Sequence, residues 1–446
     1  MRKKALFLSV MMAVVLAGCG GGKGTQGTAG KAPASAETSG ESGAKSTDGT
    51  KLTMLMYGSA EQQEKLKEVI KPFEEENNCT VDIILSSLAD YDQKLTTMIA
   101  GGTAPDAFWV AEYAVPQYYQ DGLMADLTEL LNDEEYDFSD FTEAQQNHYL
   151  YDGKLVGAPF SGAPLVCFYN KSLMEKAGLE TPTELYKKGE WTVDAMIGYA
   201  KKLTDASNNT YGIDFSRGGD WAIWDVCMTP VLKLYGGEPW SEDYKTIGIN
   251  SEKSLQGVQT FYDLITVDKA HPAPGTTIDF KAGQLALFPD LFSNVKKMVD
   301  LDFEWDVVPM PFNEDGKSTG WSGSAGYAAY SEGKNLDLSR KFVRFITSKE
   351  TIEELMHYFV PTRSSVLESE DYRTGNQGEI MRPSEESFTF CITDTIDKVR
   401  VKSPHPQYNN ISQVILEHLE EMYSGVSDPK EAVDAMADGM EEYMVK

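Results

Sequence analysis

The chain has 446 residues, 41% hydrophobic and 24% charged, and its formal net charge is −29 at pH 7. A body this acidic repels nucleic acid and anionic lipid, which excludes functions that depend on a basic surface. Its length exceeds what one compact core normally organises, so we expect two lobes in the folded part.

The first eighteen residues have the features of a secretory signal. Three basic residues at positions 2–4 precede an apolar run over residues 5–17. The run is shorter than the about 20 apolar residues that span a bilayer. It ends in Leu-Ala-Gly-Cys19, a tetrad that resembles the site where bacterial lipoproteins are cleaved and acylated. We predict removal of residues 1–18 and lipidation of Cys19; the alternative is an ordinary signal with an incidental cysteine.

Residues 19–50 are almost entirely Gly, Ser, Thr, Ala, Lys and Glu. A segment without large apolar residues buries too little surface to offset its ordering entropy. We therefore predict a flexible tether, whose typical end-to-end span is about 30 Å. Such a tether suits a globule held near a membrane surface.

Strand-like and helix-like patterns alternate in the body. Short apolar runs predict strands at residues 52–57, 80–85 and 106–110, and a helix follows the first strand. Its apolar face would carry Leu66, Val69, Ile70 and Phe73. This alternation predicts an α/β fold with largely parallel sheets wrapped by helices.

Later helices have clear start signals. Thr192 precedes a segment with apolar residues at 193, 196, 197, 200 and 203. Near the C-terminus, Asp428 is followed by Pro429 and, three residues on, by Glu431, which predicts a capped helix with a buried stripe. The four cysteines after Cys19 have no C-x-x-C spacing, and we expect no disulfide.

Six ordered pieces of sequence carry a resemblance to a known family over nearly all of the mature length. They are Ile99–Asp106 with Phe108-Trp109, Leu155–Pro159 with Phe168–Lys171, Trp191-Thr192 with Lys201–Leu203, Phe280–Leu287, Trp305–Pro311, and Gly323–Tyr327. Together they resemble the family 1 extracellular solute-binding proteins of ABC transporters, which include the maltose-binding proteins. Gln284 and Leu287 depart from the family's pattern in the fourth piece.

The resemblance implies a periplasmic-binding-protein fold of type II, in which two α/β lobes are joined by a hinge with a ligand cleft between them. We expect an N-terminal lobe of residues 51–160 with 323–401 and a C-terminal lobe of 161–322 with 402–446. The chain would cross between the lobes near Phe160, Ser322 and Lys402. Closure of the hinge would bury the ligand, and the closed form would dock on the ABC permease subunits in the membrane.

The implied ligand is a small molecule, a sugar, whose C–H faces suit aromatic rings and whose hydroxyls suit Asp, Glu and Ser. By the resemblance, Trp109 and Glu112 occupy positions that contact sugar in maltose-binding relatives. In the cluster Arg217–Trp224, Trp221 is the preferred stacking platform, with Asp220 beside it and Trp224 one helical turn on. The remaining candidates lie at strand ends and near the crossings: Tyr57, Ser59, Ser161, Asp290, Phe292, Trp321, Ser322, Gly323 and Tyr408.

Each candidate also has a structural interpretation. Trp109, Trp224 and Phe292 would equally suit a hydrophobic core, and Ser59 a simple turn. Arg363 stands in a loop, where a single arginine often caps backbone carbonyls, and we favour that role for it.

Enzymatic functions find little support. The five histidines include no H-E-x-x-H pair, Gly320–Ser324 lacks the final glycine of a nucleophile elbow, and no dinucleotide or phosphate loop is present. We expect no catalytic residue, no cofactor, no metal and no nucleic-acid partner, and a monomer.

Three alternatives stay open. The ligand would be a glycerol phosphate or its diester if Arg217 or Arg363 faced the cleft, because a phosphate needs a basic group or a helix N-terminus. A secreted glycosidase would also use tryptophans and a pair of carboxylates. A surface adhesin or sensor of the same fold would need no permease.

Overall fold

The computed structural model describes residues 49–445, apart from 89, 220, 222, 397, 398, 400 and 402–404. Cys19, Asp220 and the third expected crossing at Lys402 lie outside the described residues. Within the described part, no helix is long and apolar enough to cross a membrane.

One large sheet organises the fold, with strand order β2-β1-β3-β10-β6-β8-β7 and β9 paired to β6. Its strands are β1 (Thr50–Tyr57), β2 (Cys79–Ser86), β3 (Ala107–Ala111), β6 (Ala158–Asn170), β7 (Tyr211–Ile213), β8 (Leu285–Leu291), β9 (Trp305–Pro309) and β10 (Ser322–Ala329). A separate hairpin joins β4 (Leu150–Tyr151) to β5 (Lys154–Leu155). The three strands expected from apolar runs are confirmed as β1, β2 and β3.

The sheet is mixed, which corrects the expectation of largely parallel sheets. The pairs β1–β2, β1–β3 and β7–β8 are parallel, but β10 runs antiparallel to β3 and β6, and β6 runs antiparallel to β8 and β9. Local βαβ alternation favours parallel neighbours. β10 instead enters the sheet from a segment remote in sequence, with no crossover helix to fix its direction.

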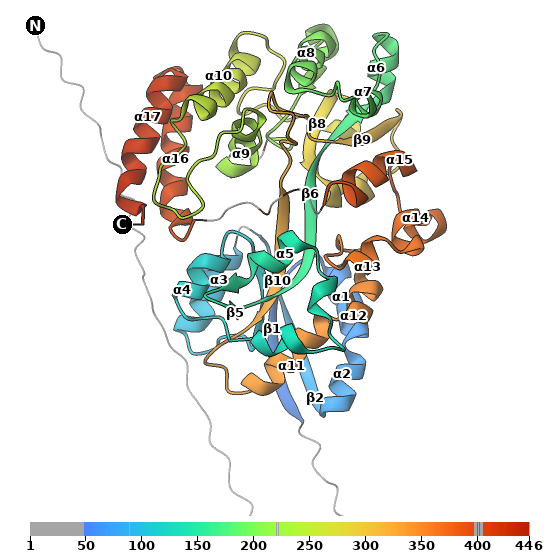
Figure 1. The fold of residues 1–446 in the computed structure, drawn as a ribbon, viewed down its shortest axis with the longest axis vertical. Helices are drawn as coiled ribbons and strands as arrows, with labels where there is room; N and C mark the ends of the chain where they lie inside the picture. Colours follow the sequence, from blue (N-terminus) through green and yellow to red (C-terminus); the bar gives the residue numbers. More distant parts are fainter. Residues whose placement is uncertain are drawn as a thin grey trace, which may run out of the picture. The chain divides into compact units, whose positions relative to one another are not determined.

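Helices pack around the sheet (Figure 1); some precede β6 in the sequence and the others follow it. Before it stand α1 (Ala60–Val69), α2 (Lys71–Asn77), α3 (Tyr91–Ala100), α4 (Val115–Gln120) and α5 (Glu143–His148). After it come α6 (Lys171–Lys176), α7 (Pro182–Lys188), α8 (Val193–Leu203), α9 (Trp224–Leu234), α10 (Glu252–Thr266), α11 (Leu336–Ile346), α12 (Lys349–Leu355), α13 (Ser364–Leu367), α14 (Glu370–Gly378), α15 (Glu385–Phe388), α16 (Tyr408–Tyr423) and α17 (Pro429–Met440). Short 3-10 turns are η1 (Thr128–Asn132), η2 (Phe138–Asp140), η3 (Ala206–Asn208), η4 (Phe280–Ala282), η5 (Phe292–Lys297) and η7 (Glu441–Tyr443), and η6 (Thr389–Thr393) is a π-helical turn.

The predicted helix starts are confirmed. Thr192 caps α8 by accepting a hydrogen bond from the Ala195 amide, and Asp428 forms a capping box with Glu431 at the start of α17. The apolar stripe after the first strand falls on two helices, because Pro72 follows the junction at Ile70. Proline lacks the amide hydrogen that would continue the α1 hydrogen-bond ladder.

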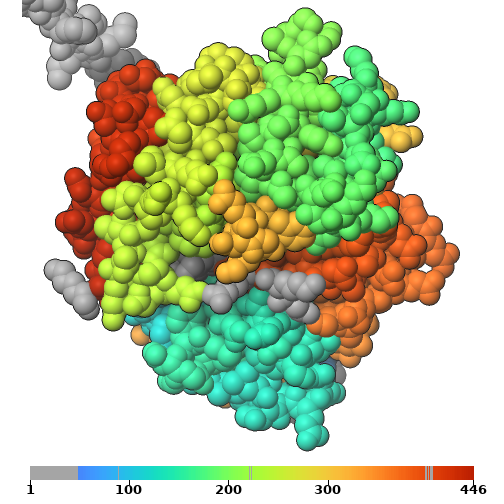
Figure 2. Space-filling model, turned by 45° about the horizontal axis from the view of Figure 1, so that its top comes forward, coloured from blue at the N-terminus to red at the C-terminus, as the bar shows by residue number. Residues whose placement is uncertain are grey.

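Buried side chains form two hydrophobic cores, and β6 contributes to both. Val166 and Phe168 point into the first core, which also holds the β1–β3 side chains. Leu165, Cys167 and Tyr169 point into the second core, with α8, α9, α10, α16 and α17. Successive strand residues face opposite sides of a sheet, which explains this alternation. On the face shown in Figure 2, the teal segment around residues 110–150 and the green segment around 170–240 occupy opposite sides.

The guanidinium of Arg363 is buried in the first core. It donates to the backbone oxygens of Thr347, Tyr136 and Asp137 at 2.9–3.2 Å and pairs with Asp140 at 3.5 Å. Its side chain is 1% exposed. The expected role as a carbonyl cap is therefore confirmed, and this arginine joins η2 to the segment after α12.

Replacing Arg363 by alanine should lower the free energy of unfolding by about 3–5 kcal/mol, because it leaves buried oxygens and a carboxylate without their donor. Urea unfolding at pH 7 measures the change. Arg373→Ala is the matched control: Arg373 pairs with Glu385, with side chains 41% and 87% exposed, and its loss should cost under about 1 kcal/mol. Equal costs for the two variants would contradict this assignment.

Candidate functional site

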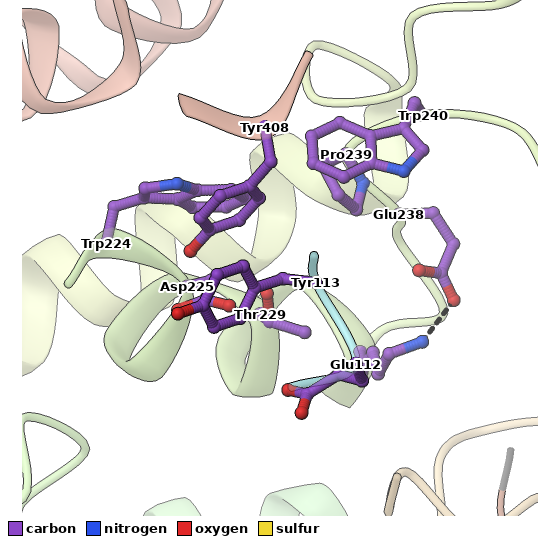
Figure 3. Close-up of a pocket in the computed structure, with 10 residues that line it drawn as sticks. Glu112, Tyr113, Trp224, Asp225, Thr229, Glu238, Pro239, Trp240 and Tyr408 are labelled. Carbon is purple, nitrogen blue, oxygen red and sulfur yellow. Dashed lines mark hydrogen bonds and ion pairs between the residues drawn. The ribbon is translucent and has the colours of Figure 1, made fainter. Parts of the chain in front are cut away.

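A pocket of about 380 Å³, measured with the solvent at its mouth, lies where elements of both cores meet. Its lining comes from the turn after β3, from α9 and the loop that follows it, and from the start of α16. The lining residues are Glu112, Tyr113, Trp224, Asp225, Thr229, Lys233, Glu238, Pro239, Trp240 and Tyr408. Figure 3 shows their arrangement.

Aromatic rings dominate the pocket. Tyr113 and Tyr408 stack with centroids 5.3 Å apart and planes 27° apart, and Trp224 stacks on Tyr408 at 6.1 Å. Trp240 meets Trp224 edge-on at 6.0 Å. Tyr113 packs against the first core, whereas Trp224, Trp240 and Tyr408 belong to the second. The Tyr113–Tyr408 contact therefore joins the two cores at the pocket.

Helix geometry places the groups from α9. Asp225, Thr229 and Lys233 are spaced by four residues, which puts their side chains on one face of the helix. Trp224 starts the helix, and its indole N–H donates to the Ser412 hydroxyl at 2.9 Å. Ser412 in turn donates to the Tyr408 carbonyl at 2.7 Å, so one hydroxyl ties the first turn of α16 to the Trp224 ring.

Glu112 is held at the end of β3 by β10. Its amide donates to the Ser324 carbonyl at 3.0 Å, and its carboxylate accepts from the Ser324 amide at 3.4 Å. Behind it, the Ser324 hydroxyl lies 2.6 Å from the Gln145 side-chain oxygen and 3.0 Å from the Tyr149 hydroxyl. Gly326 allows this packing, because a Cβ there would stand 2.7 Å from the Tyr149 ring.

The two tyrosines of the pocket keep their hydroxyl protons. Burial, followed by the charge of Asp225, raises the pKa of Tyr408 well above its usual value. Burial, followed by the charges of Asp92 and Glu112, raises the pKa of Tyr113. Both phenols are therefore protonated, and each is hydrogen-bonded to a carboxylate, Tyr113 to Asp92 and Tyr408 to Asp225. No group of three His, Cys, Asp or Glu side chains among the described residues is arranged to hold a metal ion.

Three of the predicted site residues line the pocket: Glu112, Trp224 and Tyr408. Trp221 does not, and the helical argument that paired it with Trp224 was wrong, because α9 begins only at Trp224. The Trp221 ring instead packs in the second core, 5.1 Å from Tyr423 and 5.6 Å from His271.

The candidates near the first strands lie outside this pocket. Trp109 is 7% exposed and packs between Tyr57 and Tyr91, with ring centroids 5.2 and 5.1 Å away. Tyr57 is 39% exposed. Ser59 caps α1 in a capping box with Gln62, which is the turn role left open for it. A ligand contact by Tyr57 or Trp109 stays a prediction.

The candidates near the expected crossings are also elsewhere. Asp290 forms an ion pair with Arg217 at 3.0 Å; burial raises its pKa, although Arg217 acts in the opposite direction. Phe292 is buried against Phe388 in the first core, as its structural interpretation requires. The others sit in paired strands, Ser161 on β6 and Ser322 and Gly323 on β10, with Trp321 buried just before β10. Their binding roles stay predictions.

Seven lining residues escaped the sequence analysis: Tyr113, Asp225, Thr229, Lys233, Glu238, Pro239 and Trp240. Tyr113 follows Glu112 directly, and a strand-end argument extended by one residue would have included it. Asp225, Thr229 and Lys233 carried a usable signal in their spacing of four. No sequence signal indicated Glu238–Trp240, because the path by which this loop returns to its own helix is a tertiary feature.

Comparison with known proteins identifies the family. Residues 58–353 match the family described as bacterial extracellular solute-binding proteins. The chain belongs to this family.

Relatives and a solved structure agree with the assignment. The solute-binding protein is 26% identical to the erythritol/L-threitol-binding protein of Mycolicibacterium smegmatis, over 80% of this chain and 78% of that one. It is 24% identical to the galactooligosaccharide-binding protein of Bacillus subtilis, over 89% and 90%. An ABC substrate-binding protein of Listeria monocytogenes in complex with cycloalternan superposes with a TM-score of 0.75 at 25% identity, covering 89% of this chain and 99% of that one. The shared fold is the type II periplasmic-binding-protein fold.

Half-buried His148, at the end of α5, should make the stability of the solute-binding protein pH-dependent. Burial lowers its pKa from 6.5 to about 4 despite the nearby Glu112 carboxylate, and its Nε2 has no hydrogen-bond partner among the described residues. Between these values the unfolded chain binds a proton that the folded protein does not. The free energy of unfolding should therefore fall as the pH is lowered from 6.5 to 4, by up to about 1.4 kcal/mol per pH unit.

Urea unfolding at pH 7.5 and 5.0 measures this contribution as a difference between wild type and His148→Gln. The variant should lose less stability on acidification. The same pH slope in wild type and His148→Gln would contradict the assignment.

Proposed function

We propose that this protein is a lipid-anchored receptor that captures a carbohydrate in the pocket and delivers it to an ABC permease. The observation that carries the proposal is the pocket itself, where the stacked rings of Tyr113, Tyr408 and Trp224 face carboxylate and hydroxyl groups. The names of the relatives, which bind a tetritol or galactooligosaccharides, support the same class of ligand.

A sugar has the two kinds of surface that this pocket complements. Its ring carbons present apolar C–H faces, which pack well on aromatic rings. Its hydroxyls both donate and accept, so they can pair with the carboxylates of Glu112 and Asp225 and with the Thr229 hydroxyl. Such a mixture of apolar lining and a few fixed polar groups is typical of small-molecule sites.

Capture would use movement of two lobes. We place residues 51–160 with 323–401 in one lobe and 161–322 with 402–446 in the other. Glu112 and Tyr113 then come from the first lobe, and Trp224 and Tyr408 from the second, so a ligand that touches both sets favours the closed arrangement. β6 and β10, which run antiparallel through residues 158–164 and 322–327, would form two of the crossings.

The alternative ligands are less well supported. The two arginines that could have bound a phosphoester are engaged, Arg363 with backbone oxygens and Arg217 with Asp290. Lys233, in the pocket, pairs with Glu238. The relatives and the solved structure reported above are binding proteins by name. We therefore propose binding without catalysis, by a monomer that needs no cofactor.

A thermal-shift screen of the purified protein with sugars, polyols and glycerophosphates tests the ligand class, because a ligand that binds the native state raises the melting temperature. We expect a shift with at least one sugar or polyol and recovery of that compound unchanged. A shift only with a glycerophosphate would replace our ligand class. Conversion of the sugar to a product would contradict the receptor assignment and indicate an enzyme.

Tyr408→Ala should weaken binding of the compound found in that screen at least tenfold, because it removes the ring that Tyr113 and Trp224 both contact. Tyr408→Phe keeps the ring and should retain most of the affinity. Tyr199→Ala is the control, since Tyr199 lies on α8 and donates to the Glu180 carbonyl, away from the pocket. Isothermal titration calorimetry measures all three; unchanged affinity of Tyr408→Ala would move the ligand out of this pocket.

The membrane anchor has its own test. Cys19→Ser should abolish incorporation of labelled palmitate in a bacterial host and release the protein from the membrane fraction, because a serine at this position cannot be thioether-linked to lipid. Cys79→Ala is the control, because Cys79 is a buried free thiol of the body. Membrane retention of the Cys19→Ser protein would contradict the lipoprotein assignment.

A further inference from the structure

One side of the pocket is formed by a loop that is built as a fixed wall. We call residues Glu238–Trp240 the 238–240 wall; they belong to the loop that leaves α9 and reaches α10. In Figure 3, Glu238, Pro239 and Trp240 line one side of the pocket, and Tyr113, Asp225 and Thr229 lie together on another. The open question is how far a ligand can extend in this direction.

Backbone hydrogen bonds hold the wall in place. The Gly248 and Ile249 amides both donate to the Pro239 carbonyl, at 2.9 and 3.0 Å, and the Ser254 hydroxyl donates to the Glu238 carbonyl at 3.3 Å. Gly248 lies so close that a Cβ there would stand 2.4 Å from the Glu238 carbonyl oxygen. The wall is therefore packed against the start of α10 and is not a free lid.

The Trp240 ring is also fixed. It is 4% exposed and lies between the rings of Trp224 and His405, with centroids 6.0 and 5.2 Å away. His405 contacts Tyr244 of the same loop at 5.0 Å, and the Tyr244 carbonyl accepts from the Val445 amide at 2.9 Å. Moving Trp240 aside would disturb the loop, the start of α16 and the C-terminal segment together.

The opposite side of the pocket is closed by the stacked pair Tyr113–Tyr408. A ligand that extended on that side would keep the two rings apart and so prevent the proposed closed arrangement.

We propose that the pocket selects short ligands, a polyol or a carbohydrate of one or two sugar units, and that the 238–240 wall sets this limit. The inference rests on the proposed carbohydrate-binding function and specifies its substrate class. A third unit would have to displace either Trp240 with its packed loop or the Tyr113–Tyr408 contact, so each added unit beyond the second reduces the affinity.

Calorimetric titration of the purified protein with matched series tests the limit. The probes are erythritol, mannitol, glucose, galactose and arabinose, together with the α-1,4-glucan, β-1,4-glucan, galactan and arabinan series from two to four units. We expect the tightest ligand to have one or two units, and the three- and four-unit members of its series to bind at least tenfold more weakly. Equal or tighter binding of the longer members overturns the size limit but leaves carbohydrate binding intact. No binding by any probe overturns the proposed function itself.

Variants of the wall test the cause. Trp240→Ala should raise the affinity for the three-unit sugar at least tenfold relative to that for the two-unit sugar, because it opens the side of the pocket that the 238–240 wall closes. Trp240→Leu, which keeps more of the apolar packing, should shift the ratio in the same direction and serves if the alanine variant fails to fold. The matched control is Trp305→Ala: Trp305 lies on β9 against Phe168, outside the pocket, and its loss should leave the ratio unchanged. An unchanged ratio in a folded Trp240 variant overturns the role of the wall.

Discussion

The backbone pairing of β6 is the constraint on which the rest of the structure depends. This strand has thirteen residues, a length of about 40 Å, and it takes part in both halves of the sheet. Residues 158–164 pair with β10, and residues 165–170 pair with β8 and β9. Because its side chains alternate between the two hydrophobic cores, neither core can form completely without it.

The position of the pocket follows from the same strand. Glu112 and Tyr113 directly follow β3, which pairs with β10, and β10 pairs with β6. The residues of α9 and α16 pack in the second core, which contains Leu165, Cys167 and Tyr169 of β6. A change of twist between residues 161 and 165 would therefore alter the distance between the two sides of the pocket while leaving each core intact. Such a change of twist would couple the proposed hinge closure to ligand contact.

Local signals in the sequence predicted local structure well. The caps at Thr192 and Asp428 act within one helical turn, and so they can be recognised without any knowledge of the rest of the fold. The direction of β10 could not be predicted in this way, because it depends on pairing with residues more than 150 positions away. The break between α1 and α2 was accessible in principle from Pro72, but the apolar stripe over both helices concealed it.

The site could be predicted only in part, because local sequence features indicate some of its residues and tertiary contacts place the others. Glu112 and Tyr408 were inferred from their places in a resemblance and at expected crossings, and both line the pocket. The 238–240 wall reaches the pocket only because backbone bonds from Gly248 and Ile249 turn the loop back on itself. Nothing in the sequence of the Pro239-Trp240 dipeptide indicates which cavity it will face.

Trp224 shows that a residue of the core can also line the pocket. Its ring is 2% exposed and lies in the second core, yet it lines the pocket and stacks on Tyr408. The indole is oriented by Ser412 and by the edge of Trp240 before any ligand arrives. A ring fixed in this way loses little conformational entropy on binding, so more of the contact energy contributes to affinity. The packing that makes such a residue look structural would therefore also make it an effective platform in the proposed site.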